Sequence, residues 1–159
     1  MGYIETIRQL VGHEPIILTS AGAIILDENG KILLEYRKDT GDWGIPGGYM
    51  EPGETFEETL RRELQEEMAI HVTEFTLYHV FSGKNFYHEY PNGDRVYSVI
   101  ALYTTDCFTG EIHADDTEVE KTAFFALERL PDELTSTTRY ILDHLKNKRT
   151  SDSLFCQSS

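Results

Sequence analysis

The chain has 159 residues, which is the size of one domain that can fold around its own apolar core without a disulfide or metal staple. Apolar residues make up 40% of the chain and charged residues 26%, and this composition is typical of a globular protein. The net charge of −14 repels a phosphate backbone and makes a long nucleic acid a poor partner, whereas a small anionic substrate fits if divalent cations neutralise its site.

The first third of the chain predicts a helix, two strands joined by a turn, and a loop. Apolar residues at helical spacing predict an amphipathic helix over residues 3–11. Residues 16–27 predict a buried strand, Asn29-Gly30 a hairpin turn, and residues 31–38 the returning strand. Residues 41–54 (GDWGIPGGYMEPGE) contain too much Gly and Pro for regular structure, so they predict a loop.

A helix is predicted over residues 55–69, because apolar side chains recur there every four residues and Thr55 or Glu54 can cap its start. The later elements are predicted as strands at 71–81, 94–108 and 121–127, a helical turn at 128–134 and a helix at 135–148. This order indicates an α+β fold in which helices cover a mixed sheet. We expect residues 1–15 to form a helix and lead-in, residues 16–148 the domain, and residues 149–159 a disordered tail.

Three glutamates of the 55–69 helix lie on one face. Glu63, Glu66 and Glu67 stand at i, i+3 and i+4, where like charges repel, and the second half of a helix disfavours anions. A divalent cation would offset both effects, since hard carboxylate oxygens suit Mg²⁺ or Mn²⁺. For three glutamates alone, a solvated acidic face balanced by Arg61 and Arg62 is the more frequent explanation.

The Gly-rich loop ahead of the helix makes the sequence motif more specific than the three glutamates alone. Glycine lets the backbone approach a ligand closely, so we expect Gly48 to line a substrate site, although a plain turn explains Gly47-Gly48 equally. The full spacing, Gly48-x5-Glu54-x7-Arg62-Glu63-Leu64-x-Glu66-Glu67-x-Ala69-Ile70, resembles the Nudix box, Gly-x5-Glu-x7-Arg-Glu-U-x-Glu-Glu-x-Gly-U, where U is aliphatic. One defined position differs, because Ala69 replaces the last Gly.

The resemblance extends over about residues 16–147 and implies a Nudix-type α/β/α sandwich around a mixed sheet. It also implies an enzyme that uses Mg²⁺ or Mn²⁺ to hydrolyse a nucleoside diphosphate linked to another moiety. The implied metal ligands are Glu63, Glu66, Glu67, the carbonyl of Gly47, and Glu118 with Glu120 as its competitor. Arg62 would orient a box glutamate, and members of the family differ in which glutamate acts as base.

The chemistry of such a site follows from charge. Bound cations neutralise a diphosphate and lower the pKa of a bound water, and a carboxylate takes the proton of that water as it attacks phosphorus. If the family glycine has a left-handed conformation, Ala69 costs roughly 1 kcal/mol there without removing a ligand.

Substrate specificity is weakly encoded. Arg37 is a candidate phosphate contact or a surface arginine, and Trp43 suits base stacking, although core packing is more frequent. Tyr87, within residues 82–97, lies where family members that cleave dinucleoside polyphosphates carry a tyrosine, and hairpin packing also explains it. Asn85 lies where members that cleave ADP-ribose carry a proline. An ADP-ribose-like nucleotide sugar, a dinucleoside polyphosphate and a nucleoside triphosphate therefore all stay open.

Other functions compete with hydrolysis of a small nucleotide. A non-catalytic nucleotide sensor would be expected to lose box glutamates, which this chain retains. An RNA 5′-end pyrophosphohydrolase is disfavoured by the net charge of −14, and nothing in the chain favours an isomerase. Dimerisation is common in the family, so the N-terminal helix suits either a homodimer contact or a lid on the substrate site.

The chain also lacks membrane and export signals. No apolar run approaches the roughly 20 residues of a membrane span, and residues 1–12 do not have the pattern of a signal peptide. Cys107 and Cys156 form neither a disulfide framework nor a metal-ligand spacing. We therefore expect a cytoplasmic protein.

Overall fold

The computed structural model describes the backbone of residues 2–152 and the side chains of residues 2–148. The elements follow the chain as α1 (Tyr3–Val11), β1 (Ile16–Ile25), β2 (Ile32–Arg37), β3 (Asp42–Gly44), β4 (Gly47–Tyr49), α2 (Phe56–Met68), β5 (Thr76–Phe81), the 3-10 helix η1 (Lys84–Phe86), β6 (Tyr87–Glu89), β7 (Arg95–Thr105), β8 (Val119–Phe125) and α3 (Ser136–Asp152).

The strands form two sheets. The larger is mixed and has the order β4-β1-β7-β5, with β6 also paired to β7. Its centre is the parallel pair of β1 and β7, which runs from Ile16 opposite Val96 to Ile25 opposite Thr105. The smaller sheet is antiparallel and has the order β3-β2-β8.

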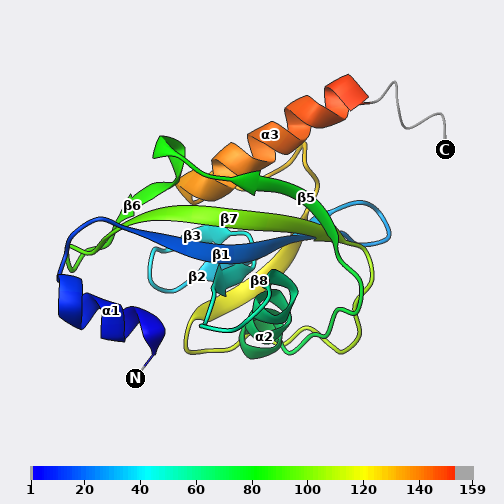
Figure 1. Ribbon diagram of the computed structural model, residues 1–159. Coiled ribbons are helices and arrows are strands. Elements are labelled where there is room, and N and C mark those ends of the chain that lie inside the picture. Colours follow the sequence, from blue (N-terminus) through cyan, green and yellow to red (C-terminus); the bar gives the residue numbers. More distant parts are fainter. Residues whose placement is uncertain (1, 153–159) are drawn as a thin grey trace.

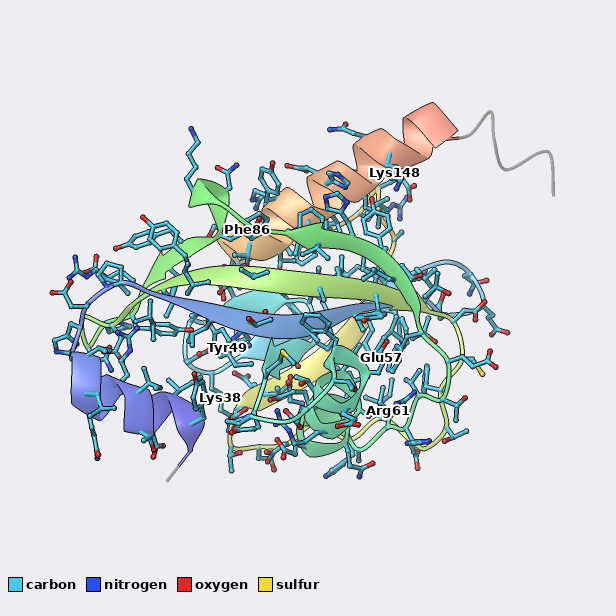
Figure 2. The ribbon with its side chains drawn as sticks, viewed as in Figure 1. Lys38, Tyr49, Glu57, Arg61, Phe86 and Lys148 are labelled. Carbon is cyan, nitrogen blue, oxygen red and sulfur yellow. The ribbon has the colours of Figure 1, made fainter. Side chains whose placement is uncertain are left out.

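Helices cover the two faces of this arrangement, α2 on one side and α3 on the other (Figure 1). In Figure 2 the labelled Glu57 and Arg61 lie on the α2 side, whereas Phe86 and Lys148 lie on the α3 side. Each face has its own apolar cluster. Side chains of β2 contribute alternately to the two clusters: Leu33 packs in the α2-side cluster, and Ile32 and Leu34 pack in the α3-side cluster. The α+β sandwich expected from the sequence is confirmed.

Helix α1 lies outside the sandwich (Figure 1). It is fastened to the start of β7, where the Arg8 guanidinium donates a hydrogen bond of 2.7 Å to the carbonyl oxygen of Arg95. His13, just after the helix, lies 2.8 Å from the Asp94 carboxylate. These contacts fix α1 beside the beginning of β1.

The expected hairpin of residues 16–38 was wrong in its pairing. The turn forms, with a hydrogen bond of 3.0 Å from the Gly30 N–H to the Asp27 carbonyl. The flanking strands, however, share only the bridge between Leu26 and Ile32 before they enter different sheets. Both edges of β1 are occupied by β4 and β7, so β2 pairs elsewhere.

Three further expectations needed correction. The Gly-rich loop contains the short strands β3 and β4, and residues 128–134 are mostly irregular backbone with bends and a bridge at Leu134, rather than a helical turn. Helix α3 continues to Asp152, so residues 149–152 of the expected tail are helical, and the rest of that tail lies outside the described residues, as does Cys156.

Cys107 is a free thiol. Within the described part of the chain, no helix combines the length and the apolar character needed to cross a membrane.

Candidate active site at the carboxylate face of helix α2

The carboxylate face of α2 is set by how the helix begins and what it buries. Thr55 caps its start in a capping box, in which Thr55 accepts from the Glu58 N–H at 3.1 Å and the Glu58 side chain accepts from the Thr55 N–H at 3.4 Å. The side chains that anchor the helix to the sheet are fully buried; they are Leu60, Leu64 and Met68. This packing fixes the rotation of the helix and places Glu63, Glu66 and Glu67 together on another side of it.

Arg62 is the centre of a hydrogen-bonded cluster at this face. Its guanidinium donates to both oxygens of Glu54, at 2.7 and 2.9 Å, and to the carbonyl of Tyr49 at 3.0 Å. It also donates to Glu63 at 2.8 Å and to Glu66 at 3.4 Å. The hydrogen bonds from Arg62 lower the pKa of Glu54 to about 2. Arg62 thus ties the loop before α2 to the glutamates of the helix.

Strand β4 brings Gly48 against the Glu63 carboxyl group. A Cβ at Gly48 would lie 2.3 Å from the Glu63 carboxyl carbon, so only glycine leaves room for this carboxylate. Gly47 has a φ of 152°, and a Cβ there would lie 2.2 Å from the Ala21 carbonyl oxygen. Both glycines are therefore required by close approach, one to a side chain and one to β1.

Glu67 is the buried member of the face. It is only 3% exposed, and Glu35 of β2, which is 0% exposed, lies beside it. None of the four carboxylate oxygens of the two residues has a hydrogen-bond partner. Burial raises the pKa of Glu67 well above its ordinary value, and the neighbouring Glu35 and Glu63 raise it further. Burial likewise raises the pKa of Glu35 and of Glu63.

These side chains have the donor chemistry for a hard divalent cation. Buried carboxylates without donors are unfavourable unless a positive charge or a proton compensates them, and carboxylate oxygens are preferred Mg²⁺ ligands. Among the described residues no group of three or more His, Cys, Asp or Glu side chains is already arranged to hold a metal ion. Arg62 draws Glu63 and Glu66 toward itself, so a cation would have to compete with this arginine for them.

The remaining predicted site residues are more dispersed. Glu118 is exposed in the turn before β8, and its charge contributes to the raised pKa of Glu35. Arg37 pairs with Asp39 at 3.0 Å and stands 3.5 Å from Glu35. Trp43 packs edge-on against Phe125, with ring centroids 4.9 Å apart, in the α3-side cluster.

Tyr87 is not brought to this face. It lies on β6, at the opposite edge of the larger sheet from β4, and its ring packs 5.0 Å from that of Tyr97. This is the hairpin packing that the sequence left open as the alternative to stacking on a base.

Two features of the site were missed by sequence reasoning, the burial of Glu35 and the pocket beside α2. The signal for Glu35 was its place two residues after Leu33, since alternation puts both side chains on the face that packs against α2. The pocket has a volume of about 310 Å³ and opens between β1, α1 and the loop before α2. No sequence pattern indicates it, because its walls come from distant segments: Tyr3, residues 17–19 and residues 49–54.

Ala69, in place of the last glycine of the motif, has the left-handed conformation that the sequence anticipated, with φ 57° and ψ 31°. It is the only residue other than glycine with positive φ in the described part of the chain. We expect Ala69→Gly to raise the free energy of unfolding by about 1 kcal/mol, because glycine has no Cβ to clash in this conformation. Urea unfolding in a metal chelator measures it, and an unchanged or lower stability would contradict the assignment of strain.

Comparison with known proteins agrees with this geometry. The NUDIX domain model matches residues 17–145. An ADP-ribose pyrophosphatase from Methanocaldococcus jannaschii is 31% identical over 78% of this chain and 71% of its own length. The crystal structure of a MutT NUDIX hydrolase from Burkholderia pseudomallei superposes with a TM-score of 0.70 and 32% identity, covering 80% of this chain and 97% of that one.

A MutT protein from Methanosarcina mazei has the same fold, with a TM-score of 0.70 at 20% identity over 86% of this chain and 97% of that one. The match to the domain model spans both sheets, α2 and most of α3. The spacing of the box, the fold and these relatives agree, and the chain therefore belongs to the NUDIX family, as a Nudix pyrophosphohydrolase.

Proposed function

We propose that this chain hydrolyses the diphosphate linkage of a nucleoside diphosphate joined to a second moiety, with Mg²⁺ or Mn²⁺ at the carboxylate face of α2. The buried, unpartnered carboxylate of Glu67 is the observation that carries the proposal. A cation compensates this charge, whereas a purely structural role would favour an apolar or hydrogen-bonded side chain at the same place.

In this proposal Glu63 and Glu67, with the carbonyl of Gly47, supply the main ligand oxygens, and Glu66 and Glu118 complete or adjoin the set. A bound cation supplies neutralisation of the diphosphate and a lower pKa for water. A carboxylate with access to solvent must accept the proton of the attacking water, and Glu66, whose side chain is 60% exposed, and Glu118 have that access.

The pocket beside α2 is proposed as the site of the nucleoside. Its volume of about 310 Å³ falls within the range of small-molecule sites. Glu54 lines it and also binds Arg62, so the pocket borders the carboxylate face. Tyr3 of α1 forms part of its wall and offers an aromatic ring to a base. Helix α1 then acts as a wall of the substrate site, fixed by the contacts of Arg8 and His13.

Among substrates, an ADP-ribose-like nucleotide sugar is preferred. The relative from Methanocaldococcus jannaschii is named an ADP-ribose pyrophosphatase, and it resembles this chain over most of both lengths. Arg37, half-exposed at the end of β2, is proposed to contact a phosphate of the substrate. The net charge of −14 favours a small metal-bound nucleotide over a long nucleic acid.

A substrate panel tests the proposal. The protein is incubated with ADP-ribose, a dinucleoside polyphosphate, a nucleoside triphosphate and a short 5′-triphosphorylated RNA, with Mg²⁺, Mn²⁺ or a chelator. We expect metal-dependent cleavage of ADP-ribose to AMP and ribose phosphate, separated by anion-exchange chromatography. Tight binding with a raised melting temperature but no turnover of any compound would instead indicate a nucleotide sensor, and preferred cleavage of the RNA would indicate a 5′-end pyrophosphohydrolase.

A further inference from the structure

Glu35 lies outside the box, on a strand of the other sheet, yet its side chain points toward α2. Successive side chains of β2 alternate between the two faces, and Leu33, two residues earlier, packs with Leu60 and Leu64 of α2. Glu35 therefore projects from the same face, one step further along the strand, where it meets Glu67. Two different elements thus deliver carboxylates to one buried place.

The surroundings of Glu35 compensate its charge only in part. The side chain is 0% exposed, and neither of its oxygens has a hydrogen-bond partner. The nearest cation is Arg37, whose Nη1 stands 3.5 Å from one oxygen. That arginine also donates to both oxygens of Asp39, at 3.1 and 3.0 Å, so its charge is shared between two carboxylates. The oxygens of Glu67 are buried and unpartnered in the same way.

A solely structural explanation does not account for this arrangement. A buried carboxyl group retained for packing is normally given hydrogen-bond donors, because a buried anion without them is costly. Here two such groups lie together, within reach of Glu63, which Arg62 holds at 2.8 Å. Three carboxylates from β2 and α2, two of them buried without hydrogen-bond donors, offer the oxygen ligands that a divalent cation prefers.

We propose that Glu35 is a further ligand of the divalent cation in this chain, supplied by β2 and paired with Glu67 of the box. The inference rests on the proposed function, because it assumes a cation at the carboxylate face of α2. It adds a ligand from the smaller sheet to a set otherwise drawn from α2 and β4. A cation at this place would satisfy the buried oxygens of both residues at once.

Mn²⁺ binding to the isolated protein tests the inference without any substrate. Purified wild type, Glu35→Gln, Glu35→Asp, Glu67→Gln and Glu89→Gln are titrated with Mn²⁺, and the free ion is measured by electron paramagnetic resonance. Glu89 is the matched control, because it loses the same charge from an exposed position on β6, at the far edge of the larger sheet. Circular dichroism confirms that each variant is folded.

We expect Glu35→Gln to weaken Mn²⁺ binding at least tenfold, as loss of groups around a metal typically does, and Glu35→Asp to restore part of it. Glu89→Gln should bind as the wild type does. Unchanged Mn²⁺ affinity in Glu35→Gln, with loss in Glu67→Gln, would overturn the role of Glu35 and leave the proposed function intact. A wild type that binds no Mn²⁺ would overturn both.

Discussion

Glu67→Gln is expected to lower kcat/KM by at least about a hundredfold, because it removes a proposed ligand of the cation, and loss of groups around a metal costs roughly 10–100-fold. Gln has nearly the same shape, so the fold of α2 should be preserved while the charge is lost. The residue is only 3% exposed and makes no hydrogen bond, so no stabilising contact is removed. Steady-state hydrolysis in Mg²⁺, beside Glu89→Gln as charge-matched control, measures the effect.

The same substitution should stabilise the protein in a chelator. Gln at position 67 is neutral and can donate a hydrogen bond to Glu35, so we expect the free energy of unfolding to rise by about 1–3 kcal/mol at neutral pH. A variant that loses activity together with stability would show that Glu67 serves the fold rather than the reaction.

The pH dependence has a definite sign. The pKa of Glu67 is raised in the folded protein by burial and by Glu35, so the folded state retains a proton that the unfolded state has released above pH 4.5. The contribution of Glu67 to the free energy of unfolding of the metal-free protein therefore falls as pH rises from about 4.5 toward that raised pKa. Glu67→Gln should show a shallower fall over this window, measured by urea unfolding at a series of pH values.

Gly48→Ala is expected to lower kcat/KM by about a hundredfold with little loss of stability. The added Cβ would lie 2.3 Å from the Glu63 carboxyl carbon, and the flexible end of that side chain can move away. Its movement displaces a proposed ligand and breaks the contact with Arg62. Kinetics and thermal unfolding of the same preparation separate the two effects.

A double mutant tests this explanation. In a Glu63→Ala background no carboxyl group remains for the new methyl group to displace, so Gly48→Ala should add almost nothing to the loss of activity. Independent, multiplying losses would show that Gly48 acts through the substrate instead. Gly47→Ala offers a contrast, because its Cβ would meet the Ala21 carbonyl of β1, which cannot move alone, and stability should fall.

The sequence predicted the parts of the site that depend on local spacing. Apolar residues that recur every four positions predicted α2, and Thr55, which caps the helix, was one of the two residues expected to do so. The helical repeat also predicted that Glu63, Glu66 and Glu67 lie on one face of α2. The left-handed conformation of Ala69 was raised only as a condition, through the glycine that the Nudix box has at this position.

Features that depend on distant segments escaped the sequence. The Asn29-Gly30 turn is a local feature, but the partners of β1 come from β4 and β7, and each β7 partner lies 80 residues further along the chain. Glycine content predicted a loop at residues 41–54, whereas Gly47 and Gly48 are there because a strand approaches β1 and Glu63 closely. Glu35 was passed over because a single charged residue in an apolar strand gives no sign of what lies opposite.

The separation of β1 and β2 into different sheets has a mechanical consequence. Glu35 belongs to the smaller sheet, while α2, which carries Glu67, packs mainly on β1 and β4 of the larger one. A cation shared by these two side chains would hold the two sheets together where both carboxyl groups are buried without hydrogen-bond donors. Binding of the ion would then also hold the smaller sheet against α2. Amide hydrogens of β2 and β8 would therefore exchange more slowly in Mg²⁺ than in a chelator.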